Sequence, residues 1–504
     1  MSNIPTPKFY SSIGFHANPF EGNTAEREPE IEHYAVRPPY LDPVEAASKG
    51  TGSYTLSGTR GSGKSATRIT VQRNMWSDEA LHPLPISLVN FTPFRGKHSS
   101  RELLELFADQ VFFLTIEACL VHSTTAIDKS IEKRLDGLQK NDKHFFDWAL
   151  KTYYLNKPES ARTASAQECC DAFSLSLARK SKLWADKKWD SITGSLIQLS
   201  ASIAKRFDVD VGDTSTFKDV LTSKKETGGS DPLYVLKKCV EFARLMGFGS
   251  LLVQVDKIDE TDWTTNDAEA AAKLIWPLYS NVQLHEIEGL SWSIFLWDRV
   301  RSLLIGENDM PVRWDKLPND VIKWDRRHLE RLVEARLEHF SDKKIKKLGE
   351  LFAEEITNED VIYSQLFSLA GVAPRTLITV LNAVMTNHIQ TNEGIGTKLT
   401  MTSLNDGLNK YAAASILDDY SVGTIGQLKK VGSTSFVTKD VAKIFTISIP
   451  GALQKIEKWI NSGLVRRDGQ RFAGERTKPV DQFVVSEPRA KRIIEMKLEL
   501  AGNI

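Results

Sequence analysis

The chain has 504 residues, with ordinary apolar and charged fractions of 41% and 26%, so two to four globular domains are expected. Its 65 basic residues balance its 65 acidic residues, which excludes an overall field that draws the whole molecule onto nucleic acid or a membrane. The cysteines lack metal-ligand spacing and two are adjacent, which suits neither a zinc site nor a disulfide framework: Cys119, Cys169, Cys170 and Cys239. Reduced thiols are the simple interpretation.

The start of the chain lacks the basic segment and apolar core of a signal peptide, so none is expected. The most apolar helical run, 103–121, carries the acidic residues Glu105, Asp109 and Glu117. Charges at that density exclude a membrane span and favour a buried helix. We therefore expect a cytoplasmic protein without a membrane partner.

Residues 1–50 are rich in proline and acidic residues, and we expect them to form a lead-in that packs on the domain that follows. A short β-prone run at 54–56 then stops at a glycine, and a helix-competent segment begins after Lys64. The residues between match the phosphate-binding pattern G-x-x-x-x-G-K-[ST]: Gly58, Thr59, Arg60, Gly61, Ser62, Gly63, Lys64 and Ser65.

Each residue type in this P-loop has a chemical role. Glycines let the backbone wrap with its N–H groups turned towards an anion at a helix N-terminus. Lys64 can reach the β- and γ-phosphates, and the Ser65 hydroxyl can ligate Mg²⁺; Thr67 of the following helix is counted with the nucleotide-binding set. The alternative is a glycine-rich turn with an accidental lysine, which the strand before it and the helix after it disfavour.

Further strands are predicted at 84–91, 249–256 and 290–297, alternating with helical segments. This order predicts an α/β fold, a parallel-sheet P-loop core over 51–325. Residues 99–244 are helical in pattern and too long for an ordinary connection, so we interpret them as a large helical insertion.

An acidic segment, D-x-x-D-E, follows the strand at 249–256 and can supply the second half of a nucleotide site. Asp256 sits where the strand ends, which would aim its carboxylate at Mg²⁺ held by Ser65. Asp259 or Glu260 can act as the general base or orient the attacking water. An exposed acidic turn is the alternative, and its pairing with a P-loop favours catalysis, with Lys64, Asp259 and Glu260 as catalytic residues.

Beyond the core, helices are predicted at 326–340, 344–355 and 374–388, within a helical lid over 326–415. Residues 418–504 form a separate unit. Thr438 is the expected N-cap of one helix, and a second spans 450–461 before Gly463. Two strands joined by a basic loop follow, and helix, turn, helix, hairpin is the order of a winged helix.

This last unit holds 15 Lys and Arg against 10 Asp and Glu, an excess of +5 in a neutral chain. Its hairpin concentrates candidate phosphate contacts to DNA: Arg466, Arg467, Arg471, Arg476 and Lys478. The alternative is a protein-docking module whose charges only solvate the hairpin.

The chain resembles prokaryotic P-loop ATPases of the AAA+/STAND class, including origin-recognition-like ATPases with a C-terminal winged helix. The P-loop and the D-x-x-D-E box carry this resemblance most strongly, with Asn18-Pro19-Phe20 and the element Gly371-Val-Ala-Pro374-Arg375 in support. It implies ATP as the nucleotide, and Arg375 as a sensor of the γ-phosphate at the start of a lid helix.

One departure from the family pattern is the aromatic Trp297 at the end of the fourth strand, which leaves Asp298 or Arg299 as the sensor of that strand. An arginine finger acting across a subunit interface would come from Arg299, Arg301 or Arg313, although each is more often a surface arginine.

Two functions remain open from the sequence. The first is an ATP-hydrolysing switch that couples nucleotide state to DNA binding; the resemblance extends this to anti-phage or other conflict systems. The second is a STAND-like signalling ATPase that controls its own oligomerisation or a separate effector protein without binding DNA. A P-loop kinase fits poorly, because such kinases lack the acidic box, the lid and the winged helix.

Overall fold

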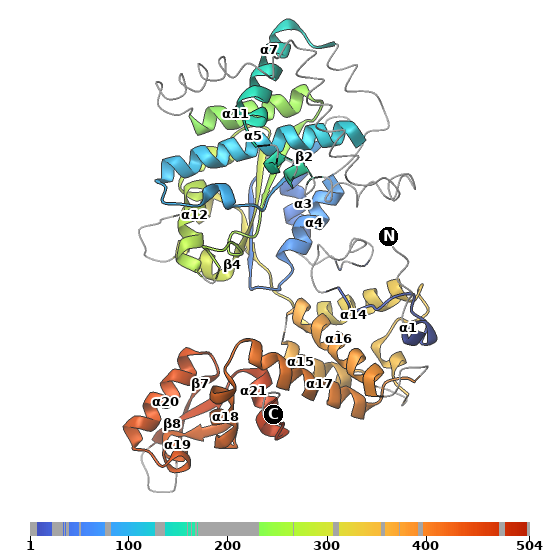
Figure 1. Ribbon diagram of the computed structural model, residues 1–504, viewed down its shortest axis with the longest axis vertical. Helices are drawn as coiled ribbons and strands as arrows, with labels where there is room; N and C mark the ends of the chain where they lie inside the picture. Colours follow the sequence, from blue (N-terminus) through green and yellow to red (C-terminus); the bar gives the residue numbers. More distant parts are fainter. Residues whose placement is uncertain are drawn as a thin grey trace. The chain divides into compact units, whose positions relative to one another are not determined.

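In the computed structural model the chain forms two compact units (Figure 1). We call Thr24–Lys323 the sheet unit, and Ser2–Asn23 together with Trp324–Ile504 the helical unit. The structure describes these residues: 8–22, 34, 36, 40–49, 52–75, 82–125, 137–158, 160–162, 164–166, 169, 231–265, 267–305, 312–353, 358–371, 373–391, 397–472 and 479–500.

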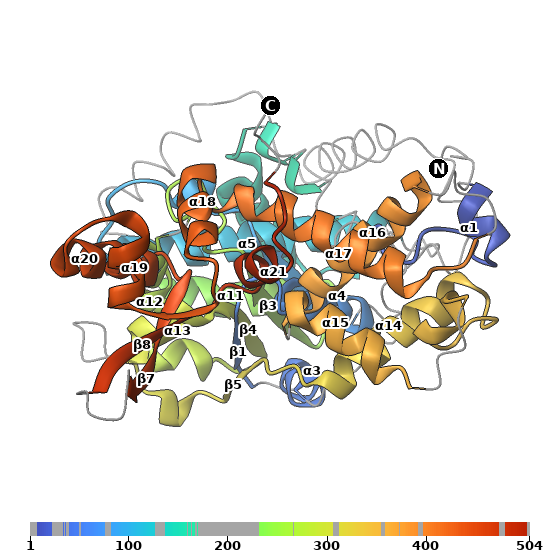
Figure 2. The ribbon, with the colours of Figure 1, turned by 90° about the horizontal axis from the view of Figure 1, so that it is seen from below.

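Five parallel strands form the sheet, in the order β2-β3-β4-β1-β5. Their bounds are Tyr54–Gly58 (β1), Pro83–Leu88 (β2), Ser250–Val255 (β3), Leu290–Trp297 (β4) and Asn319–Val321 (β5). Figure 2 shows β3, β4, β1 and β5 following one another in this order. The predicted parallel-sheet P-loop core is confirmed, and the carboxyl ends of all strands lie along one edge.

Burial explains which strands could be found from the sequence. β1 and β4 are buried over their whole length, so both read as continuous runs suited to the middle of a parallel sheet. β5 has three residues at the sheet edge and none of them is fully buried, so it lacks the apolar run from which a strand is predicted. The sequence therefore does not predict β5.

Helices cover both faces of the sheet. α3 (Leu41–Lys49) and α4 (Lys64–Met75) pack against β1 and β4, whereas α5 (Ser100–Thr125) packs on β2 and α11 (Pro232–Leu245) on β3. α12 (Ala268–Ser280) and α13 (Asp298–Ile305) complete the second group, and Figure 1 shows α4 and α12 on opposite sides of the strands. This three-layer arrangement buries the sheet on both faces.

The apolar run predicted to be a buried helix lies in α5, where Phe107, Val111, Phe112 and Ile116 belong to the core. Among the described residues, no single helix has the length and apolarity to cross a membrane. α15 (Asp360–Ala370) and α16 (Pro374–Thr391) meet that test only as a pair bent by 113°.

The described part of 99–244 is helical. After α5 it contains α7 (Lys140–Ala149), a π-helical stretch over Leu150–Leu155, and α11. α5 and α11 pack together through Phe112 and Phe242, whose ring centroids lie 5.9 Å apart. Phe112 also stacks on Tyr153 of the π-helical stretch at a centroid distance of 4.3 Å. Residues 170–230 lie outside the described residues.

Four helices build the first core of the helical unit: α14 (Arg326–Phe340), α15, α16 and α17 (Met401–Ser415). The N-terminal segment with α1 (Lys8–Ser12) joins this core through Phe9, Phe15 and Phe20. Arg336 of α14 holds it by donating to the carbonyl oxygens of Pro19 at 2.7 Å and Gly22 at 3.0 Å. The prediction that all of 1–50 packs on the nucleotide domain is thus wrong for this segment, because its aromatic side chains are buried in the core of the helical unit. Further along the described part of 1–50, α3 does pack on the sheet.

The predicted helix at 344–355 is also wrong. The structure has a single 3₁₀ turn, Leu348–Leu351, after which Phe352 forms a parallel bridge with Leu399. The amide of Ala353 donates to the Leu399 carbonyl at 2.8 Å, and the amide of Leu399 donates to the Leu351 carbonyl at 2.8 Å. Long-range pairing therefore takes backbone groups that a helix would use.

The C-terminal part contains α18 (Val422–Val431), β6 (Ser435–Val437), α19 (Thr438–Phe445), α20 (Ile449–Asn461), β7 (Val465–Phe472), β8 (Pro479–Val485) and α21 (Pro488–Glu495). β6, β8 and β7 form an antiparallel sheet. The predicted order of helix, helix and hairpin is present, while the winged-helix interpretation stays a prediction. Thr438 is not the N-cap: Val437 occupies that position, and its amide donates to Asp440 at 2.9 Å.

Candidate functional site

The P-loop joins β1 directly to α4 at the carboxyl edge of the sheet. Gly61 and Gly63 have φ values of 76° and 99°, a conformation that L side chains rarely adopt. A Cβ placed on Gly58 would lie 2.5 Å from Ser62 Oγ, so the loop closes tightly over the end of the strand. The glycines of the pattern thus make the amide-lined turn that an anion requires.

Lys64 is the first residue of α4, and its ammonium folds back over the loop. Nζ donates to the carbonyl oxygens of Gly58 at 2.8 Å and Thr59 at 2.9 Å. Burial lowers the pKa of Lys64, while nearby carboxylates, Asp259 foremost, act in the opposite direction. The lysine therefore lies inside a partly buried site surrounded by acidic side chains.

Asp256 follows β3 immediately and is 2% exposed. Its Oδ2 accepts from Arg68 Nε at 3.0 Å, and its Oδ1 accepts from the amide of Lys257 at 2.9 Å. Lys257 has a φ of 63°, so the chain leaves the strand through a strained turn. Arg68 lies on α4 one turn beyond Ser65, which places the predicted metal-binding aspartate against the helix that begins at the P-loop.

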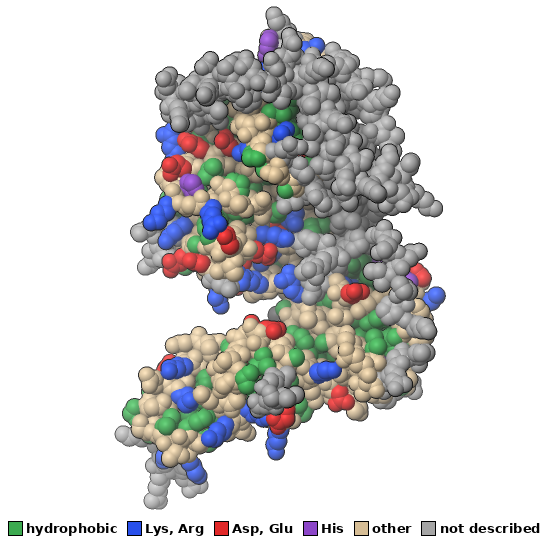
Figure 3. All heavy atoms as spheres, viewed as in Figure 1, with side chains coloured by type: hydrophobic (Ala, Val, Ile, Leu, Met, Phe, Trp, Pro, Cys, Tyr) green, Lys and Arg blue, Asp and Glu red, His purple; other side chains and the backbone are tan. Residues whose placement is uncertain are grey.

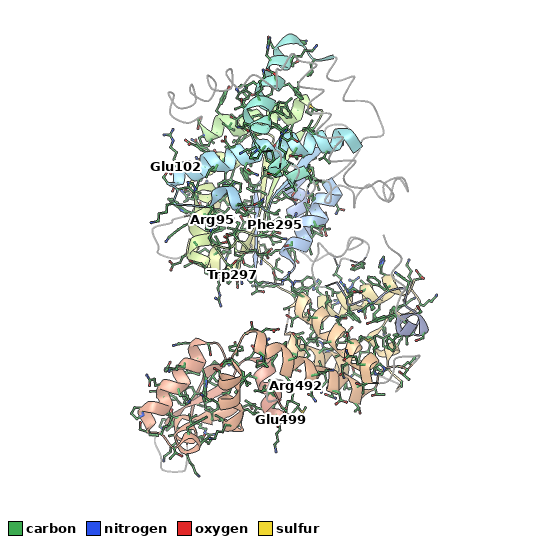
Figure 4. All side chains as sticks on the ribbon, in the orientation of Figure 1. Arg95, Glu102, Phe295, Trp297, Arg492 and Glu499 are labelled. Carbon is green, nitrogen blue, oxygen red and sulfur yellow. The ribbon has the colours of Figure 1, made fainter. Side chains whose placement is uncertain are left out.

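Asp259 contacts the P-loop itself. Arg60 donates through Nε to Asp259 Oδ2 at 3.1 Å and through a terminal nitrogen to the Asp259 carbonyl at 3.2 Å. The Arg60 guanidinium also lies over the Trp297 ring, 4.5 Å from its centroid. Trp297 pairs in register with Gly58, and Figure 4 labels it near the end of β4. Glu260 follows as an exposed side chain.

The P-loop and the acidic segment therefore meet, although about two hundred residues separate them in the sequence. Ser65, half-buried, stands at the start of α4, and the Thr67 hydroxyl donates to the Gly63 carbonyl at 3.0 Å. Sequence reasoning missed Arg68 as the partner of Asp256. Its spacing of one helical turn from Ser65 was the available signal.

Magnesium requires oxygen ligands and usually keeps several waters, so one hydroxyl and one carboxylate beside a phosphate suffice. Ser65 and Asp256 fit this donor set, and the tight turn at Gly58 fits an amide cradle for the phosphate. Within the described ranges, no group of three or more His, Cys, Asp or Glu residues has the arrangement of a metal site. The residues present thus match a metal that is shared with a phosphate ligand.

The candidate sensor and finger arginines have partners within the chain. Arg313 forms two hydrogen bonds to Asp315, at 2.8 and 2.7 Å, and Arg301 donates to Asn319 Oδ1 at 3.0 Å. Arg299 lies over the Trp297 ring at 5.1 Å, next to Asp298 at the start of α13. These contacts agree with the alternative that Arg301 and Arg313 are surface arginines and not arginine fingers.

Arg375 is exposed on the first turn of α16, immediately after Pro374. It belongs to the helical unit, whereas the P-loop belongs to the sheet unit. Its role as a sensor of the γ-phosphate therefore stays a prediction.

The C-terminal hairpin carries three described basic candidates, which we call the hairpin arginines: Arg466, Arg467 and Arg471. Arg466 pairs with Asp468 at 3.4 Å, Arg467 with Glu457 at 2.5 Å and Arg471 with Asp440 at 3.7 Å. Each arginine therefore already has an acidic neighbour that a phosphate must displace or tolerate. Arg476 and Lys478 lie outside the described residues.

Apolar side chains are exposed beside this hairpin. Ile447 and Ile449 at the start of α20 are 37% and 50% exposed, and Leu453 on the same helix is 40% exposed. Lys455 of α20 covers the rings of Phe445 and Trp459. The exposed face of α20 is thus mixed, with apolar and basic character.

Together the fold and the edge site define a P-loop nucleotide-binding core with an acidic segment at the neighbouring strand. No protein-family model matches the sequence, and no curated protein matches it.

Two solved structures of Aeropyrum pernix origin-recognition proteins overlap with the fold. ORC1 in complex with DNA has 11% identity and a TM-score of 0.37, covering 94% of this chain and 96% of its own. ORC2, in ADPNP-ADP complexes, has 13% identity and a TM-score of 0.30, covering 61% and 84%. Both are proteins of the origin-recognition class that the sequence resembles. The STAND resemblance stays a prediction.

Proposed function

We propose that the chain is a magnesium-dependent ATPase whose site is formed by the P-loop and the D-x-x-D-E segment. The observation that carries the proposal is the contact of the acidic segment with the P-loop through the Arg60–Asp259 ion pair, at 3.1 Å, and with the helix that the P-loop begins through the Arg68–Asp256 ion pair, at 3.0 Å. A phosphate-binding loop alone would bind an anion; with carboxylates beside it, the edge can also hold a metal and activate water.

The position of each site residue determines whether it binds phosphate or metal in this proposal. Loop amides and Lys64 bind the β- and γ-phosphates, and release of the Lys64 ammonium from the Gly58 and Thr59 carbonyls supplies its donors. Ser65 and Asp256 would hold Mg²⁺, which supplies charge neutralisation at the phosphate oxygens when bound. Arg68 pairs with the buried Asp256 carboxylate and orients it.

Glu260 is the residue we propose as general base, and Asp259 as its positioning neighbour. The Asp259 carboxylate is engaged by Arg60 and is only 7% exposed, whereas Glu260 is exposed beside the loop. In this assignment Glu260 accepts a proton from the attacking water, and the Arg60–Asp259 pair fixes the distance between loop and base.

The proposal is tested by nucleotide binding to Lys64→Ala, measured by titration calorimetry with ATP and Mg²⁺. Loss of the ammonium should weaken binding by about 100-fold or more, because a charge-assisted contact to phosphate disappears in a partly buried site. Lys316→Ala, a change of an exposed lysine on the same unit, is the matched control and should bind normally. Undiminished affinity in Lys64→Ala would remove the P-loop assignment.

DNA is the partner we propose for the C-terminal hairpin, supported by the excess of 15 basic over 10 acidic residues in 418–504. A protein effector is the second candidate, and the exposed Ile447, Ile449 and Leu453 favour it. Light scattering with and without ATP and duplex DNA separates them: a DNA-bound mass supports the first, and ATP-dependent self-assembly indifferent to DNA supports the second.

A further inference from the structure

The sheet unit contains a second pocket, of about 820 Å³, away from the P-loop residues. Its walls come from the loop that follows the 3₁₀ turn Thr92–Phe94, the first turns of α5, the loop after Glu260, and helices α12 and α13. Figure 4 labels Arg95 and Glu102, from two of these segments, on the α5 side of the unit. A volume of this size suits a small-molecule ligand.

Aromatic and apolar side chains form the interior wall. Phe94 and Leu103 are buried, and Trp263 and Trp276 pack against the core. Among the described residues, the buried indole N–H groups of both tryptophans have no acceptor. Because these N–H groups are shielded from the open volume, the two indoles offer a ligand their ring surfaces rather than their donors.

The mouth of the pocket is basic. Lys97 and Lys273 line it with exposed side chains, and within the described part of the chain neither has an ion-pair partner. The neighbouring cation Arg95 differs, since it pairs with Asp262 at 3.3 Å. Glu269 is the single acidic residue of the lining. Figure 3 shows basic and acidic side chains gathered on the face that carries α5 and α12.

We propose that this pocket binds a small organic anion with a planar apolar body, and that the bound anion changes the rate of ATP hydrolysis. The aromatic wall takes the planar body, and the two lysines take the anionic group.

The link to hydrolysis rests on the proposed ATPase function and on the loop that carries Trp263. This loop begins with Asp259 and Glu260 and is closed by short hydrogen bonds: Thr264 Oγ1 donates to the Ile258 carbonyl at 2.5 Å, and the amide of Thr265 donates to the Thr261 carbonyl at 2.8 Å. The neighbour of Trp263 is thus bonded to the residue that precedes Asp259, and we expect a ligand that contacts Trp263 to act on the acidic segment through this bond.

Binding is measured first, with 8-anilinonaphthalene-1-sulfonate as the probe and the full chain saturated with ADP. We expect saturable fluorescence enhancement at one site per chain. The double variant Lys97→Gln, Lys273→Gln should weaken it by about tenfold, since two charge contacts are lost. The control double variant Lys237→Gln, Lys316→Gln removes two exposed lysines of the same unit and should bind normally.

A second variant, Ala270→Phe, fills the pocket without changing its charge and should abolish saturable binding. Far-UV circular dichroism checks that each variant is folded. Equal probe binding by the wild type, the lysine variant and the filled variant would overturn the site, and so would the absence of saturable binding by the wild type.

Coupling is measured next, as ATP turnover at rising probe concentration. We expect a change of at least about twofold in the wild type and none in Ala270→Phe, corresponding to a modest coupling free energy. Probe binding without any change in turnover overturns the coupling. Absence of turnover in the wild type overturns the proposed ATPase function instead, while the binding result stands independently.

Discussion

Arginine has opposite surroundings in the two units. In the sheet unit, Arg68 pairs with Asp256 where both side chains are almost fully buried, at 7% and 3% exposed, and 188 residues separate them. In the helical unit, the hairpin arginine Arg466 pairs with Asp468, two positions away, with side chains 67% and 42% exposed. The first pair joins distant parts of a site, whereas the second only neutralises a local surface.

The difference shows what an ion pair can be expected to do. A buried pair is costly to break because the remaining charge is left without a partner in a poorly solvated place. An exposed pair is screened by water and salt and contributes little to stability. Contacts in the sheet unit should therefore govern folding and turnover, and those of the hairpin should govern only partner binding.

The largest effect is expected at the site edge. Glu260→Gln should keep ATP affinity and lower turnover by about 100-fold or more, because the base that accepts the water proton is lost. Turnover and nucleotide affinity are measured on the same preparation.

Asp259→Asn is the matched variant, since it removes the partner of Arg60 and leaves Glu260 in place. It should reduce turnover less than Glu260→Gln does. Normal turnover in Glu260→Gln, with loss in Asp259→Asn, would transfer the role of base to Asp259.

The second effect concerns stability. Arg68→Met should destabilise the sheet unit by about 3–5 kcal/mol, because Asp256 is left as a buried charge without its cation. Urea denaturation measures it. Arg466→Met, at the exposed pair, is the control and should leave the midpoint almost unchanged; equal destabilisation by both variants would contradict the comparison.

A buried acid without an arginine in contact tests the comparison further. Burial raises the pKa of Glu117 to about 8, although the Tyr154 hydroxyl, which donates to Oε1 at 3.3 Å, and the charge of Arg162, which is not hydrogen-bonded to it, both act to lower it. Among the described residues Oε2 has no partner. The pKa of Glu117 in the folded state lies above its value in the unfolded state. The contribution of Glu117 to the free energy of unfolding is therefore complete below about pH 4.5 and is lost as the pH rises towards 8.

Glu117→Gln should remove this pH dependence. The difference in free energy of unfolding between the variant and the wild type should therefore shift in favour of the variant by roughly 2–4 kcal/mol between pH 5 and pH 8. Urea denaturation at both pH values measures the difference. Glu105→Gln on the same helix is the control, since its carboxylate faces Arg101 at 3.2 Å near the surface. If the free energy of unfolding changes with pH equally in the wild type and in Glu117→Gln, the pH dependence does not come from Glu117.

The smallest effect belongs to the hairpin. Replacing Arg466 and Arg471 by Gln should weaken duplex DNA binding by about tenfold or less and flatten its salt dependence, because about two phosphate contacts are lost. Fluorescence anisotropy at several salt concentrations measures both. Lys429→Gln with Lys491→Gln, on helices of the same unit, is the control. An unchanged salt slope would favour a protein as the partner.

The regular parts of the fold could be predicted because local patterns carry them. The buried run of β4 and the apolar face of α14 follow directly from the spacing of their residues, and both bounds match. The helix expected at 344–355 failed because Phe352 pairs with Leu399, and a local pattern contains no information about a partner so far along the chain. The packing of the N-terminal aromatic side chains was predicted wrongly for a similar reason. Apolar side chains show that a segment is buried, but not against which core it packs.

The chemistry of the site divides in the same way. Residue types and spacing alone identified the P-loop and the acidic segment, because phosphate and metal binding demand glycine, lysine, hydroxyl and carboxylate groups in a short order. Sheet order then decided that β4 lies between β1 and β3, that Trp297 supports Arg60, and that Arg68 neutralises Asp256. Those partners depend on which strands and helices become neighbours, and that choice is made by burial of the whole sheet on both faces.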